Sequence, residues 1–98
     1  MEEKKKGEIQ IEIDENTAHG VYSNLAMIGH SEGEFILDFI FMQPQNRKAK
    51  VRSRVILSPN HTKRLLTALK DNITKYEARF GALKSNIDDE NKKVGFYN

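Results

Sequence analysis

The sequence predicts an α+β fold, in which an antiparallel β-meander of about four strands is followed by one long C-terminal helix packed on one sheet face. Two patterns support this prediction. Short segments in the first half of the chain alternate apolar and polar residues, which is typical of antiparallel strands with one solvated face. The residues after Ser58 instead repeat apolar side chains at helical spacing. An apolar helix stripe and an apolar sheet face bury each other, so we expect them to form a single core.

The first three strands are expected at residues 8–13, 21–30 and 34–41. The first has the clearest alternation, with Ile9, Ile11 and Ile13 separated by polar residues. The second alternates less regularly, and a polar turn at residues 31–33 joins it to the third. The length of this turn predicts that His30 lies opposite Glu34.

The third and fourth strands define the two faces of the predicted sheet. Odd-numbered residues of the third strand are expected to face the helix: Phe35, Leu37, Phe39 and Phe41. The alternation of the fourth strand, residues 48–57, places its four basic residues on the outer face: Lys48, Lys50, Arg52 and Arg54. The loop between these strands predicts Phe41 opposite Ala49, which brings Asp38 next to Arg52.

The long helix has clear start and stop signals. Ser58 is a suitable N-cap, and Pro59 fits the first helical position because that position needs no N–H donor. Gly81 supplies the left-handed conformation that commonly ends a helix. One apolar stripe follows the helix between these limits: Leu65, Leu66, Leu69, Ile73, Tyr76 and Phe80.

The composition is that of one small domain. The chain has 98 residues, a net charge of +2 and no cysteine, so disulfides and thiolate metal sites are excluded. Residues 1–7 are expected to be a disordered tail, residues 8–81 the single domain, and residues 82–98 a flexible tail. No apolar run is long enough to span a bilayer, so we expect a cytoplasmic protein with no membrane partner.

Two stretches resemble a known family. The segments GVYSNLAMIGHSEGEFILDF and KAKVRSRVILSPNHTKRLLTALKDNITKYEARFG are similar to a bacterial family catalogued as domain of unknown function 3467. The resemblance covers residues 8–81, and its most specific strings are EFILDF and SRVILSPNHTKRLL. It implies a small bacterial cytoplasmic domain, and it brings no activity and no residue roles. The loop at residues 42–47 is more polar than the resemblance implies.

No catalytic or metal-binding pattern is present in the sequence. His19, His30 and His61 are the imidazoles, and none of them has convergent partners for zinc binding or for acid–base chemistry. The serines lack a nucleophile motif. We therefore expect a protein that is not an enzyme and that has no cofactor and no metal site.

The basic face of the fourth strand is one candidate binding surface. Cations along a sheet face can follow a phosphate backbone, so Lys48, Lys50, Arg52 and Arg54 form a candidate surface for single-stranded nucleic acid. The opposing interpretation is an internal ladder of salt bridges, because four acidic residues share the predicted face: Glu8, Glu12, Glu34 and Asp38. The sequence leaves both interpretations open.

An apolar patch on the outer face is the other candidate. In the predicted register Ile36 and Ile40 lie beside Ile28 on the face that points away from the helix. A contiguous apolar group on a surface suggests that another chain covers it, and open sheet edges invite strand addition. The leading hypothesis is therefore a homo-oligomeric module for protein–protein interaction with an unknown protein partner. The alternative is a single-stranded nucleic-acid binder.

Overall fold

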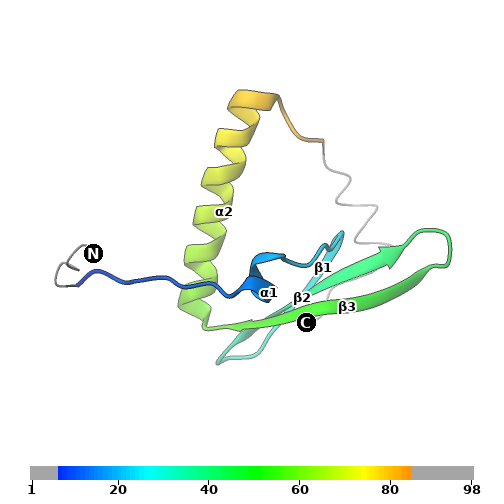
Figure 1. Ribbon diagram of the computed structural model, residues 1–98, viewed down its shortest axis with the longest axis horizontal. Coiled ribbons are helices and arrows are strands. Elements are labelled where there is room, and N and C mark those ends of the chain that lie inside the picture. Colours follow the sequence, from blue (N-terminus) through cyan, green and yellow to red (C-terminus); the bar gives the residue numbers. More distant parts are fainter. Residues whose placement is uncertain (1–6, 85–98) are drawn as a thin grey trace.

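The computed structural model describes residues 7–84, and this part of the chain contains three strands and two helices. In order they are α1 (Glu15–Ala18), β1 (Leu25–His30), β2 (Phe35–Gln43), β3 (Lys48–Leu57) and α2 (Pro59–Phe80). The strands form one antiparallel sheet in the order β1-β2-β3, and α2 rises away from the end of β3 (Figure 1). The predicted α+β class, with an antiparallel sheet before a long helix, is confirmed. The predicted tails lie largely outside the described residues.

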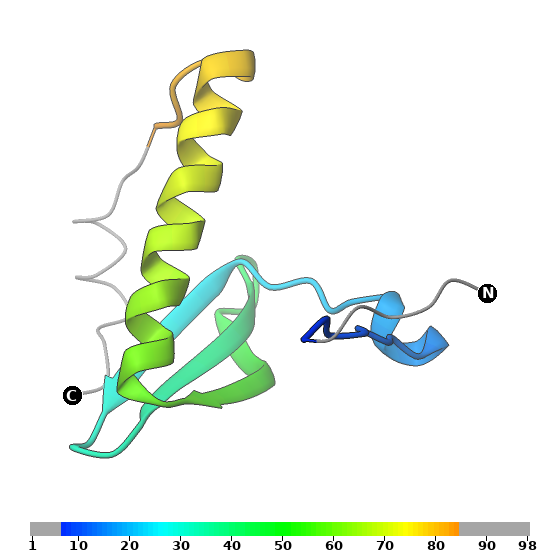
Figure 2. The same ribbon diagram turned by 90° about the vertical axis from the view of Figure 1, so that its left-hand side faces the viewer.

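The sheet has three strands, so the prediction of about four is wrong. Residues 8–13, which were expected to form the first strand, pair with no strand in the described part of the chain. They run away from the sheet, and α1 follows them (Figures 1 and 2). Asp14 caps α1, because its carboxylate accepts a hydrogen bond of 2.9 Å from the backbone N–H of Thr17. Alternation gives residues 8–13 the pattern of a strand, but a strand also needs a neighbouring strand with which to form hydrogen bonds. In this structure the segment does not lie beside the sheet.

The register between β1 and β2 differs from the prediction by one residue. His30 pairs with Phe35 rather than with Glu34, because the turn closes with a hydrogen bond of 2.9 Å from the Ser31 N–H to the Glu34 carbonyl. A shift of one residue moves a side chain to the other face. Ile28 is therefore opposite Leu37, on the face from which α2 rises.

A β-bulge in β3 corrects the predicted pairing of β2 with β3. Phe39 pairs with Ser53, whereas Ile40 pairs with Val51, so Arg52 is left without a partner on β2. The extra residue reverses the alternation of β3 on either side of the bulge. No glycine marks the position, so the sequence pattern gave no sign of it.

The pairs on the two sides of the bulge show its effect. Asp38 pairs with Arg54, not with Arg52, and Phe41 pairs with Lys50, not with Ala49. Cross-strand partners share a face. Arg54 therefore lies on the face of Asp38, and Lys50 lies on the opposite face with Phe41.

The predicted limits of α2 are correct. The Ser58 hydroxyl accepts a hydrogen bond of 3.2 Å from the His61 N–H, Pro59 is the first helical residue, and Gly81 ends the helix at φ 98°. The expected packing of α2 along the sheet is not found, because no residue of α2 is buried. Only its N-terminal half lies against the sheet, beside Ile28, Phe35 and Leu37. The remainder extends beyond the strands (Figure 2).

The buried core of the described chain is small and centres on β2. Leu37 and Ile40 are its buried apolar residues, and Asp38 between them is also buried. Asn24 fixes the chain just before β1 to the end of β2, since its side-chain amide exchanges two hydrogen bonds with the backbone of Met42 at 3.0 and 2.9 Å. A core of this size leaves most of the large apolar side chains on the surface.

Candidate functional site

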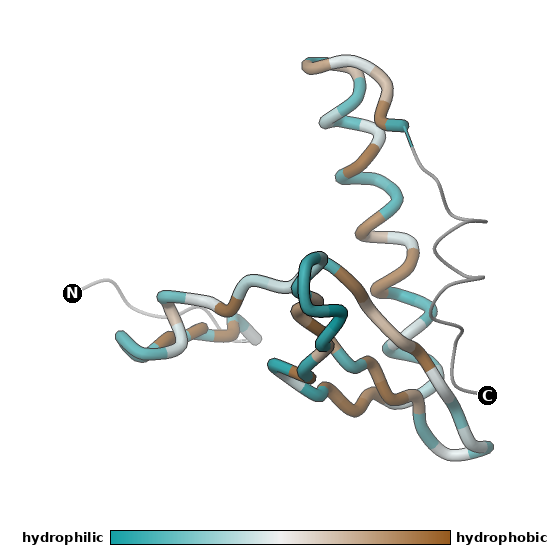
Figure 3. The backbone as a smooth tube through the Cα atoms, turned by 90° about the vertical axis from the view of Figure 1, so that its right-hand side faces the viewer, coloured by the Kyte–Doolittle hydropathy of each residue, from teal (hydrophilic) through white to brown (hydrophobic). Residues whose placement is uncertain are grey.

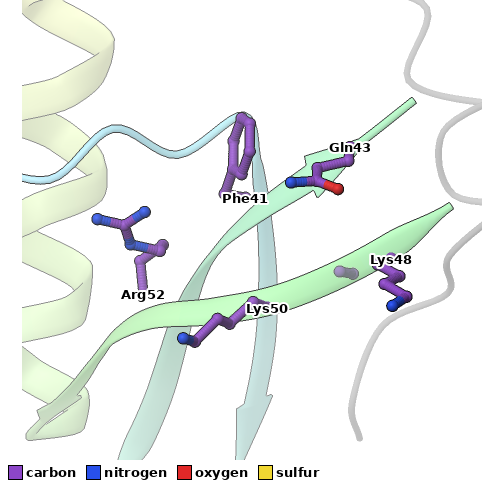
Figure 4. Close-up of a pocket in the computed structure, with 6 residues that line it drawn as sticks. Phe41, Gln43, Lys48, Lys50 and Arg52 are labelled. Atoms are coloured by element: carbon purple, nitrogen blue, oxygen red, sulfur yellow. The ribbon is translucent and has the colours of Figure 1, made fainter. Parts of the chain in front are cut away.

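The bulge at Arg52 divides the predicted basic row into two parts. Phe41 and Gln43 extend from β2 and Lys48, Lys50 and Arg52 from β3 around a shallow hollow of about 530 Å³ (Figure 4). The fourth basic residue, Arg54, is not part of the hollow, because it lies on the other face of the sheet. The structure thus brings together three of the four predicted residues beside an aromatic ring, but on the sheet face of Phe41 and Leu37 rather than on the predicted outer face.

Arg54 has a structural partner instead. Its Nε and Nη2 atoms donate hydrogen bonds of 2.7 and 2.8 Å to the two carboxylate oxygens of Asp38. The Asp38 side chain is fully buried, whereas the Arg54 side chain is 57% exposed. Such a bidentate pair offsets the free-energy cost of removing the Asp38 carboxylate from water. Arg54 therefore supports the sheet rather than a binding surface.

Of the predicted salt-bridge ladder, the structure shows the pair of Asp38 and Arg54. Asp38 is on the face opposite the hollow, and Glu34 precedes β2 at the far end from Lys48. Asp38 therefore pairs with Arg54, and on α2 Asp71 pairs with Lys75. The cations of the hollow thus face solvent near Phe41, against which Tyr22 packs edge to face at 6.0 Å between ring centroids.

The predicted apolar patch on the outer face is wrong. Ile28 lies on the α2 side of the sheet, as its pairing with Leu37 requires, and Ile40 is only 4% exposed. Ile36 remains on the outer face opposite Ile56. The prediction failed because it depended on the register between β1 and β2.

A different apolar surface runs along α2, and the sequence reasoning missed it by assigning the stripe to the core. Leu66, Leu69 and Phe80 are 59%, 55% and 64% exposed. Figure 3 shows the hydrophobic residues spaced along the helix beyond the sheet. Where α2 meets the sheet, an apolar groove of about 390 Å³ is lined by Ile28, Phe35, Leu37, Pro59, Thr62, Lys63, Leu65, Leu66 and Leu69.

The titratable side chains of the described residues are scattered over the fold. Residues 7–84 contain no group of three or more histidine, aspartate and glutamate side chains that could hold a metal ion. His30 stacks on Phe35 at 5.3 Å between ring centroids. Hydrogen bonds from Thr17 lower the pKa of Asp14, which reflects its role as a helix cap. Neither helix in this part of the chain has the length and apolar character needed to cross a membrane.

Comparison with known proteins identifies the family. The family model described as a protein of unknown function, DUF3467, matches residues 1–85. The chain therefore belongs to this family. Comparisons with curated proteins and with solved structures gave no match.

Proposed function

We propose that this member of the DUF3467 family is a self-associating module without enzymatic activity, in which a second copy of the chain covers the apolar stripe of α2. The stripe is formed by Leu65, Leu66, Leu69, Ile73, Tyr76 and Phe80, and each of these side chains is at least 38% exposed. Isolated apolar residues on a surface are ordinary, but a contiguous stripe is typical of an interface.

The length of the stripe favours a second α2 as its partner. From Leu65 to Phe80 the helix rises about 23 Å, a length suited to the roughly 800 Å² that each partner of a stable complex buries. A two-fold axis places the same surface on both sides of an interface, so the stripe of one copy packs against the stripe of the other. A helix with no buried residue also gains most from such a partner, because tertiary packing provides most of the stability of helices in proteins.

Substitution within the stripe tests the proposal. Leu69→Asp should weaken self-association at least about tenfold, because burial of a leucine contributes about 1.5–3 kcal/mol and 1.4 kcal/mol corresponds to a factor of ten. Thr67→Asp adds the same charge to the opposite side of α2 and should have little effect. Sedimentation velocity over a range of concentrations measures both variants. A monomeric wild-type protein, or equal effects of the two substitutions, would contradict the proposal.

Folding of the variants needs a separate check. Far-UV circular dichroism should show that Leu69→Asp retains its helix and sheet signals under the conditions of sedimentation. Leu66→Gln, which removes apolar surface without adding a charge, provides a second variant in the same stripe. It should weaken association in the same direction as Leu69→Asp.

A second candidate function, binding of single-stranded nucleic acid, is supported by the hollow around Phe41. Its three cations can contact phosphates, and an aromatic ring on the same face can stack on a base. The candidate predicts an affinity for oligonucleotides that falls steeply with salt. Lys50→Ala should make this salt dependence shallower, and Phe41→Ala should weaken binding. Lys75→Ala, on α2, is the matched control, and absence of binding at low salt would eliminate this function.

A further inference from the structure

The segment of residues 8–13 has the pattern of a strand but no partner strand. Its apolar side chains Ile9, Ile11 and Ile13 are 85%, 88% and 66% exposed. Three isoleucines in water forgo about 1.5–3 kcal/mol each compared with full burial. The polar residues Glu8, Gln10 and Glu12 alternate with them. Such a segment becomes stable when one side meets an apolar face and the other side meets solvent or opposite charge.

The outer edge of β3 has the matching pattern. In the described chain β3 pairs with β2 alone, so its other edge presents unpaired backbone groups. Lys48 and Lys50 lie on the side of β3 that they share with Gln43 and Phe41, and Arg52 lines the same hollow. Ala49 and Val51, which pair with Met42 and Ile40, lie on the other side.

We propose that residues 8–13 of one copy add as a fourth strand to the outer edge of β3 of a second copy. This proposal rests on the proposed self-association and specifies how the copies are joined. Adding the segment to β3 sets Glu8 and Glu12 on the side of the three cations. The same pairing places the isoleucines on the side of Ala49 and Val51, next to the buried Ile40.

The other edge of the sheet matches the segment less well. β1 carries Leu25 and Met27 on one side and Ala26 and Ile28 on the other, so neither side offers cations to the two glutamates. Opposite charges on neighbouring strands favour their pairing, whereas carboxylates beside apolar side chains gain nothing. Charge complementarity therefore selects β3.

The path of the chain favours a second copy over the same one. Residues 8–13 lead through α1 to β1, and β1 is the edge strand farthest from β3. Asn24 holds the chain against Met42 at that side. Figures 1 and 2 show that the segment projects away from the sheet. A reciprocal exchange about a two-fold axis then gives each copy the four-stranded sheet that the sequence pattern predicts.

Pairs of single-cysteine variants test this arrangement, since the natural chain has no cysteine. Gln10→Cys mixed with Lys50→Cys, and Ile11→Cys mixed with Val51→Cys, combine residues expected on the same side of the extended sheet. A short bifunctional thiol reagent should cross-link these mixtures at least about tenfold more than the opposite-side mixtures of positions 10 with 51 and 11 with 50, because side chains on opposite faces cannot meet. A mixture of single-cysteine chains reports only links between chains.

The outcomes separate this inference from the proposed self-association. A wild-type protein that associates but shows equal cross-linking in all four mixtures would overturn strand exchange and leave self-association intact. A wild-type monomer would overturn both. A variant with cysteines at positions 10 and 50 that links only within one chain would also overturn the exchange. Ile11→Asp should weaken association measured by sedimentation more than its matched control Gln10→Asp, and equal effects would count against the exchange.

Discussion

At the scale of single residues, the pair of Asp38 and Arg54 shows why charge on a sheet surface is not in itself a binding site. Four basic residues alternate along β3, and the structure uses one of them to compensate a buried carboxylate. The bulge at Arg52 determines which basic residue pairs with Asp38. It places Arg54 on the face of Asp38, whereas the other three basic residues lie around the hollow on the face of Phe41. The sequence shows the alternation but not the bulge, so the prediction of one outer row was wrong: Arg54 keeps the predicted face of Asp38, whereas Lys48 and Lys50 lie on the face of Phe41.

Loss of the Arg54 guanidinium should therefore destabilise the fold. Arg54→Ala is expected to lower the free energy of unfolding by about 3 kcal/mol, because removing one partner of a buried charge pair is strongly destabilising. Arg52→Ala, at the neighbouring exposed position, should change it by less than about 0.5 kcal/mol. Urea denaturation at a fixed protein concentration measures both, and similar losses would contradict the structural role assigned to Arg54.

The cap of α1 gives a prediction that depends on pH. Hydrogen bonds from the side chain and backbone of Thr17 lower the pKa of Asp14, so the cap is complete above the usual aspartate value and is lost as the pH falls through the lowered value. The amide resonance of Thr17 should accordingly titrate with a midpoint below about 3.9. Nuclear magnetic resonance detects this titration. In Asp14→Asn, which keeps an acceptor but has no titrating group, the same transition should be absent.

At the scale of elements, helix limits were easier to predict than strand pairing. Ser58, Pro59 and Gly81 act locally, each through its own backbone geometry or side-chain acceptor, so the sequence alone places α2 correctly. Strand register depends on a turn that is one residue longer than expected after His30. It also depends on a bulge that no residue type marks. The inward direction of Phe35 and Leu37 was nevertheless predicted correctly, because alternation within β2 continues without interruption.

The start of α2 should be sensitive to its cap. Ser58→Ala removes the acceptor for the His61 N–H and is expected to destabilise the protein by about 1 kcal/mol. Ser58→Asp retains an acceptor and should restore most of that loss. Denaturation followed by the helix signal in circular dichroism measures the difference. Equal stability of the alanine variant and the wild type would show that the cap contributes little.

At the scale of the whole molecule, the described chain is rich in exposed apolar side chains for its size. The α2 stripe and the isoleucines of residues 8–13 lie on separate segments, and both are exposed in the part of the chain that the structure describes. Sequence reasoning assigned both to one core, because a pattern of apolar spacing does not show whether the side chains are buried or exposed in the folded chain. The fold class was therefore predictable, whereas the exposure of these two apolar surfaces was not.

Association of this kind couples stability to concentration. A partner that binds the folded chain raises its stability by mass action, so the midpoint of thermal unfolding should rise as the protein concentration increases. The midpoint of Leu69→Asp should vary much less over the same range. Differential scanning calorimetry measures both. A wild-type midpoint independent of concentration would indicate that a single chain folds without a partner.

The junction at Ser58 has a mechanical consequence. This one residue separates the last residue of β3 from the first residue of α2, so the helix has no loop in which to absorb a change of direction. A helix of this length spans about 33 Å, and a swing of about 10° at its base would displace its far end by about 6 Å. A small change in the twist of β3 would thus produce a larger displacement at the far end of α2. In the proposed dimer, this displacement would change the angle between the two molecules.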